Sequence, residues 1–290
     1  MGTASARTVE KVGVVGLGTM GSGIAQLCVQ AGVPTVACES TLELAERGRG
    51  MIEKQLARSV EKGRLSEEEK ERTLGLLEPA ADVGALEGCD LVIEAVFEDL
   101  AVKHDLFGRI EGVVGHDTVL ATNTSALSVT EIAAPLAHPE RVVGMHFFNP
   151  APVLPLVEVI RGELTSGAAF DTAYAFAEHI GKDPIACDDT PGFVVNRILI
   201  PVLNDAVQVL EEGTASAEDI DKGMRLGTGW PIGPLALIDL IGIDVHVHVC
   251  EALWNAYREP KFAPPPRLVR MTKAGLLGRK SGQGFYTYDR

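Results

Sequence analysis

Two hydrophobic periods divide the chain. Up to about residue 188, short apolar runs alternate with longer stretches of helical period, and such alternation is typical of a parallel, doubly wound sheet. The expected strands are KVGVV, TVACE, DLVIEAV, TVLAT, RVVGMHFF, VEVI and residues 184–187. The expected helices are residues 19–32, 41–63, 66–77, 100–114 and 168–180. The pattern predicts an α/β fold with a Rossmann-type, mostly parallel sheet.

The pattern changes after the segment DDTPGF. Helical period then predominates in residues 192–212, 217–226, 238–257 and 266–274, and only GFYTY near the end suggests a strand. We therefore expect a domain over residues 8–189 and an all-helical C-terminal domain over residues 190–290. The stretch PIGPLALIDLIGIDVHVHVCEALW has more apolar surface than a small domain hides, which favours a subunit interface there.

Composition narrows the classes of partner. The formal net charge of −14 over 290 residues argues against nucleic acid as the main partner. Five cysteines without CxxC spacing favour reduced thiols and a cytoplasmic location. The start MGTASARTVE has no apolar signal core, and no run reaches membrane-spanning length, so no membrane association is expected.

A glycine-rich turn follows the first strand. Its sequence, Gly16-Leu17-Gly18-Thr19-Met20-Gly21, fits GxGxxG and opens a helix, and Glu39 ends the next strand. Such glycines allow a tight turn and let a pyrophosphate approach a helix N-terminus. The Glu39 carboxylate would accept hydrogen bonds from the ribose hydroxyls and repel a 2′-phosphate, which favours NAD over NADP. The alternative is a turn that only packs against the sheet.

Two further groups of polar residues lie at positions that suit a ligand. Asn123, Thr124 and Ser125 end the TVLAT strand, at the edge where open α/β sheets bind ligands. Alternatively, Ser125 caps the helix that begins near Ser128. Asn196 lies on the apolar face of the 192–212 helix, so its amide is either paired in a core or directed into a site.

The stretch HFFNPAPVLPLVEVI contains two ionisable residues among apolar ones. His146 and Glu158 would lose hydration there, which costs several kcal/mol per charge unless they are paired. A strand, a proline-rich turn and a second strand would bring the two together. The pair either holds two strands in the core or performs acid–base chemistry. The remaining histidines lack ligand spacing, and we predict no metal.

A basic stripe lies on the second predicted helix. Lys54, Arg58 and Lys62 follow one another at intervals of four residues, so they share one helix face. The stripe is either a solvated helix face or a binding surface for a phosphorylated substrate.

Several motifs occur together in an order that resembles the L-3-hydroxyacyl-CoA dehydrogenase family, most closely its short bacterial 3-hydroxybutyryl-CoA dehydrogenases. They are GLGTMGSGIA, LVIEAVFEDLAVKHDLF, NTSALSVTEIA, RVVGMHFFNPAPVLPLVEVI, PGFVVNRIL, PIGPLALIDLIGID and LGRKSGQGFY. The resemblance spans nearly the whole chain. It implies an oxidoreductase that interconverts (S)-3-hydroxyacyl-CoA and 3-oxoacyl-CoA with NAD, and a homodimer formed through the C-terminal domain.

The resemblance also implies individual roles. His146 would be the catalytic base, oriented by Glu158, while Ser125 and Asn196 would hold the C3 oxygen and thioester region of the acyl-CoA substrate. The implied NAD contacts are the GxGxxG residues with Glu39, Glu98, Lys103, Asn123 and Asn149, and the implied CoA contacts are Lys54 and Arg58. Asp99 and Trp230 depart from the Asn and His that are common in the family.

Two other functions stay open on the sequence alone. One is a dehydrogenase of the same fold that acts on a hydroxy acid or sugar acid without CoA. The other is a non-enzymatic NAD-binding or structural protein, since a fold does not by itself fix a function.

Overall fold

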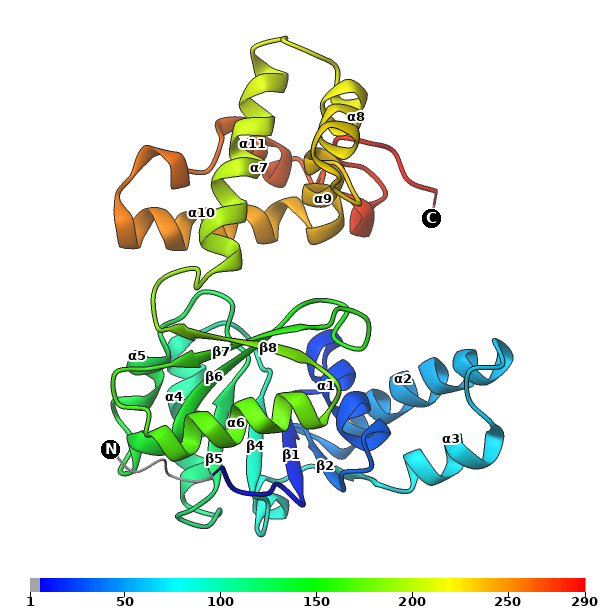
Figure 1. Ribbon diagram of the computed structural model, residues 1–290, viewed down its shortest axis with the longest axis vertical. Coiled ribbons are helices and arrows are strands. Elements are labelled where there is room, and N and C mark those ends of the chain that lie inside the picture. The colour runs from blue at the N-terminus through cyan, green and yellow to red at the C-terminus, as the bar shows by residue number, and fades with distance from the viewer. Residues whose placement is uncertain (1–5, 290) are drawn as a thin grey trace. The chain divides into compact units, whose positions relative to one another are not determined.

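One sheet of eight strands organises the first part of the chain in the computed structural model, which describes residues 6–289 (Figure 1). The strands are β1 (Val12–Val15), β2 (Thr35–Cys38), β3 (Leu77–Ala80), β4 (Leu91–Glu94), β5 (Val119–Thr122), β6 (Val142–Phe147), β7 (Leu156–Arg161) and β8 (Asp183–Asp188). Their order is β3-β2-β1-β4-β5-β6-β7-β8. Every neighbouring pair is parallel except the antiparallel pair β6–β7. The predicted Rossmann-type, mostly parallel sheet is confirmed.

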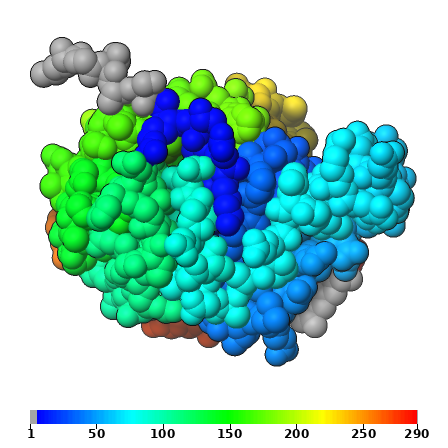
Figure 2. All heavy atoms as spheres, turned by 90° about the horizontal axis from the view of Figure 1, so that it is seen from below, coloured from blue at the N-terminus to red at the C-terminus, as the bar shows by residue number. Residues whose placement is uncertain are grey.

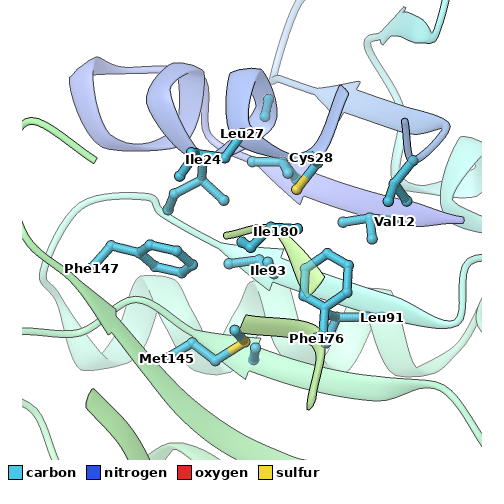
Figure 3. Packing of buried hydrophobic residues seen from close by; sticks show 14 of the residues in the cluster. Val12, Ile24, Leu27, Cys28, Leu91, Ile93, Met145, Phe147, Phe176 and Ile180 are labelled. Carbon is cyan, nitrogen blue, oxygen red and sulfur yellow. The ribbon is translucent and has the colours of Figure 1, made fainter. Parts of the chain in front are cut away.

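Helices cover both faces of this sheet. They are α1 (Thr19–Gln30), α2 (Leu42–Glu61), α3 (Glu67–Leu74), α4 (Leu100–Glu111), α5 (Val129–Ala133) and α6 (Gly167–His179), with single turns η1 (Val83–Leu86) and η2 (Pro139–Arg141). Because both faces are covered, β1, β2, β4 and β5 are buried along their whole length, as their continuous apolar sequences require. One core lies between α1, α6 and the sheet, where Ile24, Leu27 and Phe176 pack against Met145 and Phe147 (Figure 3).

The segment before β1 lies across the surface near α6. The backbone N–H of Arg7 donates to Thr172 Oγ1 over 3.0 Å, and the Arg7 guanidinium pairs with Asp117 at 3.1 Å. Figure 2 shows this segment in dark blue between regions coloured green and cyan. Residues 1–5, part of the stretch where the sequence shows no apolar signal core, lie outside the described residues.

The strand β3 was not predicted from the sequence. Its four residues include Glu78 and Pro79, which are poor strand formers, so the segment carries no apolar alternation. It nevertheless pairs in parallel with β2 at the edge of the sheet. Edge strands tolerate such residues because one side of the backbone needs no partner strand.

A second compact unit begins at Pro191, while the first ends at Thr190. Its helices are α7 (Val195–Glu211), α8 (Ala217–Thr228), α9 (Pro234–Ile241), α10 (Ile243–Tyr257) and α11 (Pro266–Lys273), with turns η3 (Pro260–Phe262) and η4 (Arg279–Ser281). Its main core contains Leu203, Val207, Leu235, Ile238 and Leu268. This confirms the predicted helical C-terminal domain. In the described part of the chain, no helix combines the length and apolarity that a bilayer crossing requires.

Two predictions in this unit are wrong. Residues 238–257 do not form one helix, because the helix breaks at Gly242. This residue has a positive φ of 103°, a backbone conformation that glycine adopts far more readily than other residues. The segment GFYTY is not a strand, since its only ladder contact is an isolated bridge between Gln283 and Thr287. Hydrogen bonds to the buried carboxylates of Asp221 and Asp239 hold it instead, and Asp221 accepts from Tyr286 Oη at 2.8 Å. Asp239 accepts from Phe285 N, Tyr286 N and Tyr288 Oη, each at 3.0 Å.

A buried histidine on α10 is held in its neutral form. Asn204 donates through its Nδ2 to the carbonyl oxygens of Lys261 and Ala263, so its Oδ1 is turned to accept from His246 Nε2 at 2.9 Å. Nε2 therefore carries the proton and Nδ1 is a bare nitrogen, which has no hydrogen-bond partner among the described residues. Burial lowers the pKa of His246 to about 4, because a charged ring there would be neither hydrated nor paired.

This burial predicts a stability that falls in mild acid. An unfolded histidine titrates near pH 6.5 and His246 near 4, so the stability is full above pH 6.5 and is lost as the pH falls through this window. Between pH 7.5 and 5.0 the loss amounts to about 2 kcal/mol. Urea unfolding followed by Trp230 and Trp254 fluorescence should show this loss, and His246→Gln should remove it. The exposed neighbour His248→Gln is the control; an unchanged pH dependence in His246→Gln would contradict the assignment.

Candidate functional site

The glycine-rich turn between β1 and α1 leaves room for a ligand at one glycine and packs tightly at the other two. Gly16 has a φ of 89°, and a Cβ there would lie 2.8 Å from the carbonyl oxygen of Ala95. A Cβ on Gly21 would overlap the carbonyl oxygen of Gly16. At Gly18 nothing lies within 4 Å of the added Cβ position. The three glycines thus serve a tight turn, an open approach and close helix packing, which is the division of roles in dinucleotide-binding turns.

A cavity of about 660 Å³ opens beside this turn. The residues that line it include five of the expected NAD contacts, Gly16, Gly18, Thr19, Met20 and Glu39. A second group consists of Val83, Phe97, Val102, Leu106 and Arg109. The cavity lies at the carboxyl ends of β1, β2 and β4, where the strand order reverses, which is where open α/β sheets bind ligands. The sequence patterns did not identify Val83, Phe97, Val102, Leu106 and Arg109 as lining a binding site, because they are ordinary helix and loop residues in the sequence. Only their position around the cavity distinguishes them.

Glu39 is fixed at the end of β2 by the glycine-rich turn itself. Its Oε1 accepts from Leu17 N at 2.7 Å, and its Oε2 accepts from Ser40 N at 3.0 Å. The carboxylate is therefore held at the wall of the cavity. A dinucleotide with free ribose hydroxyls suits such an acceptor, and a 2′-phosphate would meet like charge. The residues present fit NAD.

The turn after β5 is organised around the carboxylate of Glu98. Its Oε1 accepts from Thr124 Oγ1 at 2.6 Å, from Ser125 N at 2.7 Å and from Ala126 N at 3.0 Å. Burial alone would raise the pKa of Glu98, but the charge of Lys103 and these hydrogen bonds outweigh it and lower the pKa. The carboxylate thus remains ionised and sets the position of the Ser125 backbone.

Lys103 lies beneath this turn and not on the wall of the cavity. Its ammonium contacts both carboxylate oxygens of Glu94 at 2.7 Å and Glu98 Oε2 at 3.3 Å, and its side chain is fully buried. Thr122 Oγ1 completes the cluster with a 2.8 Å hydrogen bond to Glu94. The predicted contact between Lys103 and NAD stays a prediction. Lys103 compensates the charges of the buried Glu94 and the partly exposed Glu98, and so helps to hold Glu98 in place.

Other predicted residues near the strand ends take separate positions. Asn123 Oδ1 accepts from Phe147 N at 2.9 Å and so ties the end of β5 to β6. Asn149 is exposed in the loop after β6. The alternative that Ser125 caps the next helix is wrong, because Ser128 is the cap of α5 and accepts from Glu131 N. That helix end is also held by Asp189, whose carboxylate accepts from the Ser128 hydroxyl at 2.6 Å.

His146 and Glu158 face each other across the antiparallel pair β6–β7. They are register partners, and His146 Nδ1 lies 2.7 Å from Glu158 Oε2, with both side chains buried. Because a carboxylate can only accept, Nδ1 carries the proton and Nε2 is the basic nitrogen of the neutral ring. The predicted pairing is therefore observed. The Phe148 ring packs against the imidazole with its centroid 4.5 Å away.

The alternation of β6 explains which way His146 points. Met145 and Phe147 belong to the core shared with α1 and α6 (Figure 3). Successive side chains on a strand point to opposite faces, so His146 faces the other side of the sheet. Val157 and Val159 place Glu158 on that same side by the same rule. A one-residue slip in either strand would bury valine or phenylalanine at this site and move the ionisable groups into the core.

The remaining predicted residues lie on helices α2 and α7. Lys54 and Arg58 are exposed on α2, which buries Ile52 and Leu56 on its opposite face. Asn196 is half-buried in the first turn of α7 in the second unit. The two departures have local explanations. Asp99 caps α4, accepting from Val102 N at 3.0 Å, a role that Asn fills equally well, and Trp230 packs against the core of the second unit.

The described residues contain no group of three or more His, Cys, Asp or Glu side chains placed to hold a metal ion. All five cysteines carry free thiols. Burial raises the pKa of Cys28 and Cys250 to about 12, so neither is a ready nucleophile at neutral pH.

Comparison with known proteins places both units in one family. Residues 11–190 match the family model described as 3-hydroxyacyl-CoA dehydrogenase, NAD binding domain, and residues 192–288 match the C-terminal domain of the same family. A 3-hydroxybutyryl-CoA dehydrogenase of Mycobacterium tuberculosis is 46% identical over 282 residues, covering 97% of this chain and 99% of that protein. One of Clostridioides difficile is 42% identical over 280 residues, covering 97% and 100%.

A solved structure extends the likeness to three dimensions. The crystal structure of (S)-3-hydroxybutyryl-CoA dehydrogenase PaaH1 from Ralstonia eutropha matches with a TM-score of 0.94 and 42% identity, over 98% of this chain and 100% of that one. A match over 98% of the chain includes residues of both units. The chain therefore belongs to the 3-hydroxyacyl-CoA dehydrogenase family and is an NAD-dependent oxidoreductase.

Proposed function

We propose that the protein interconverts (S)-3-hydroxybutyryl-CoA and acetoacetyl-CoA, with His146 as the acid–base residue and Glu158 as its orienting partner. The observation that carries this proposal is the buried 2.7 Å hydrogen bond between His146 Nδ1 and Glu158 Oε2. A core pair that only joined two strands would need no nearby dinucleotide turn. Here the same sheet presents such a turn and its cavity at the carboxyl ends of β1 and β4.

The chemistry follows from the tautomer. The dinucleotide held by the glycine-rich turn and Glu39 would supply the hydride acceptor for C3 of the substrate, and in its reduced form the hydride donor for the reverse direction. His146 Nε2 takes the proton of the C3 hydroxyl, while the Nδ1 proton stays on the ring and remains hydrogen-bonded to Glu158, whose negative charge stabilises the imidazolium. In the reverse direction the imidazolium protonates the ketone oxygen. Acid–base assistance of this kind is worth about 10²–10⁴ in rate.

We assign the binding of NAD to the glycine-rich turn with Glu39, and to Asn123, Asn149, Glu98 and Lys103 around the turn after β5. The open space at Gly18 and the acceptor at Glu39 support the first part of this assignment. For Glu98 we propose a mainly supporting role, since its Oε1 is already occupied by three donors of the chain.

We assign the acyl-CoA substrate to Ser125 and Asn196, which would hydrogen-bond its C3 oxygen and thioester region, and to Lys54 and Arg58. The two cations lie exposed, one turn apart, on a chain whose net charge is −14. That local excess of positive charge suits the phosphates of CoA.

A homodimer formed by the second unit completes the proposal. Leu226, Leu240 and Val245 are 74%, 50% and 44% exposed on its helices. Burying such residues against a second copy would remove apolar surface from water.

The first test is NADH oxidation on addition of acetoacetyl-CoA, with free acetoacetate and NADPH run in parallel. We expect NADH absorbance to fall only with the CoA ester, and NADPH to be poor because of Glu39. Turnover of free acetoacetate or another hydroxy acid at similar kcat/KM would favour the enzyme without CoA. Binding of NADH with no turnover of any such substrate would favour the non-enzymatic protein.

Glu158→Gln should lower kcat sharply while the protein stays folded. The amide preserves the shape of the carboxylate but can present its N–H₂ to Nδ1, which favours the wrong tautomer and cannot stabilise the imidazolium. We expect kcat to fall about 10²-fold or more, with the Kd for NADH within about twofold of wild type. The checks are steady-state kinetics and fluorescence titration of NADH. Near-normal turnover in Glu158→Gln would remove Glu158 from the mechanism.

Gly18→Val should weaken NADH binding without harming the fold. Its side chain would enter the open space where a pyrophosphate must approach, and we expect the Kd to rise at least about tenfold, or 1.4 kcal/mol. The matched control is Gly50→Val on α2, whose Cβ also meets nothing within 4 Å but lies away from the cavity. Equal NADH affinities in the two variants would exclude Gly18 from the binding site.

A further inference from the structure

The loop that joins the two halves of the His146–Glu158 pair has few donors of its own. It runs over residues 148–155 and contains Pro150, Pro152 and Pro155, which have no backbone N–H. Its internal hydrogen bonds are those of Val153 N and Leu154 N, both donated to the carbonyl oxygen of Pro150. The remaining carbonyl groups must find their donors elsewhere in the fold.

One side chain from a distant part of the chain supplies such donors. Lys182 stands between α6 and β8, and its ammonium donates to the carbonyl oxygens of Ala151 at 2.6 Å and Leu154 at 2.9 Å. Lys182 is 7% exposed, and no carboxylate of the described residues pairs with it. Burial lowers its pKa as a consequence. Burying an ammonium group that contacts only two carbonyl oxygens costs folding free energy. This cost points to a role for Lys182 in holding those carbonyls in place.

The two carbonyls that Lys182 binds belong to the part of the loop that contacts the dinucleotide-binding helix. A Cβ on Gly23 of α1 would lie 3.0 Å from Pro152 Cδ and 3.3 Å from the Ala151 side chain. Asp183 N, the next residue after Lys182, also donates to the carbonyl of Pro155 at 2.9 Å. The loop is thus fastened at Ala151, Leu154 and Pro155 while it rests on α1.

We propose that Lys182 is a positioning residue for hydride transfer. Its ammonium fixes the 148–155 loop against α1, and thereby sets the site of the dinucleotide relative to the His146–Glu158 pair. His146 lies two residues before this loop and Glu158 three residues after it. A shift of the loop would therefore reach both the cofactor side and the acid–base side. The proposal rests on the reaction proposed above, and Lys182 itself touches no reacting atom in it.

The test compares Lys182→Met with wild type in single-turnover reduction of acetoacetyl-CoA. Methionine keeps most of the apolar stem but removes the donors, so the loop loses its fastening and little packing. We expect the rate of hydride transfer to fall at least about tenfold, because small misplacements of reacting groups are this costly. We expect the KM for acetoacetyl-CoA to change less than about twofold. NADH deuterated at the transferred position should show a larger isotope effect on kcat in the variant, since hydride transfer becomes more limiting.

Two further variants separate positioning from general stability. Lys11→Met, at the amino end of β1, is the matched control and should leave hydride transfer unchanged. Lys182→Arg keeps charge and donors and should recover part of the rate. If Lys182→Met does not fold, Lys182→Gln is measured, because its shorter amide cannot reach both carbonyls. Hydride transfer within about twofold of wild type in Lys182→Met, or in Lys182→Gln where that variant is measured instead, would overturn the proposal. Absence of turnover in wild type would instead refute the reaction on which it rests.

Discussion

The site depends on one antiparallel strand pair inside an otherwise parallel sheet. Strands β6 and β7 are joined by a short loop, so residues only twelve positions apart become direct neighbours, as His146 and Glu158 do. A parallel pair would need a long crossover and could not bring them together so locally. The register also places both groups on one face and the flanking Met145, Phe147, Val157 and Val159 on the other. Core packing and acid–base geometry therefore select the same register.

In the first unit, which ends at Thr190, buried charges are compensated by neighbouring groups and help to position segments of the backbone. Lys103 lies between Glu94 and Glu98, and Glu98 in turn holds the turn that carries Ser125. Removing one member of the cluster would leave an uncompensated buried charge, which lowers the free energy of unfolding by about 3–5 kcal/mol. Such clusters add little net stability to the fold. The same logic applies to Lys182, which is compensated by carbonyl dipoles alone.

Sequence patterns predicted the features that depend on local periodicity or on short spacing. The sheet, the glycine-rich turn and the His146–Glu158 pairing all arise within short segments, where alternation and turn residues determine the outcome. The sequence patterns did not predict features that depend on contacts between residues far apart in the chain. Nothing near Lys103 in the sequence indicates that its ammonium pairs with Glu94. At Gly242 the glycine permits a break, but the hydrogen bond from Ile243 N to the carbonyl oxygen of Leu277 is a distant contact that no local pattern indicates. Lys182 belongs to the same class, since its acceptors lie 31 and 28 residues away.

These distant contacts also explain how a loop rich in proline can hold a precise position. Proline restricts φ and lowers the entropy that the loop loses on folding, but it removes the donors that would tie the loop to a strand. A lysine ammonium has three donors on a flexible stem and can bind two carbonyls that no backbone N–H reaches. Stiffness then comes from the loop sequence and its placement from Lys182. The cofactor turn is built in a comparable way, since its glycines provide the space while Glu39 holds the turn through Leu17 N.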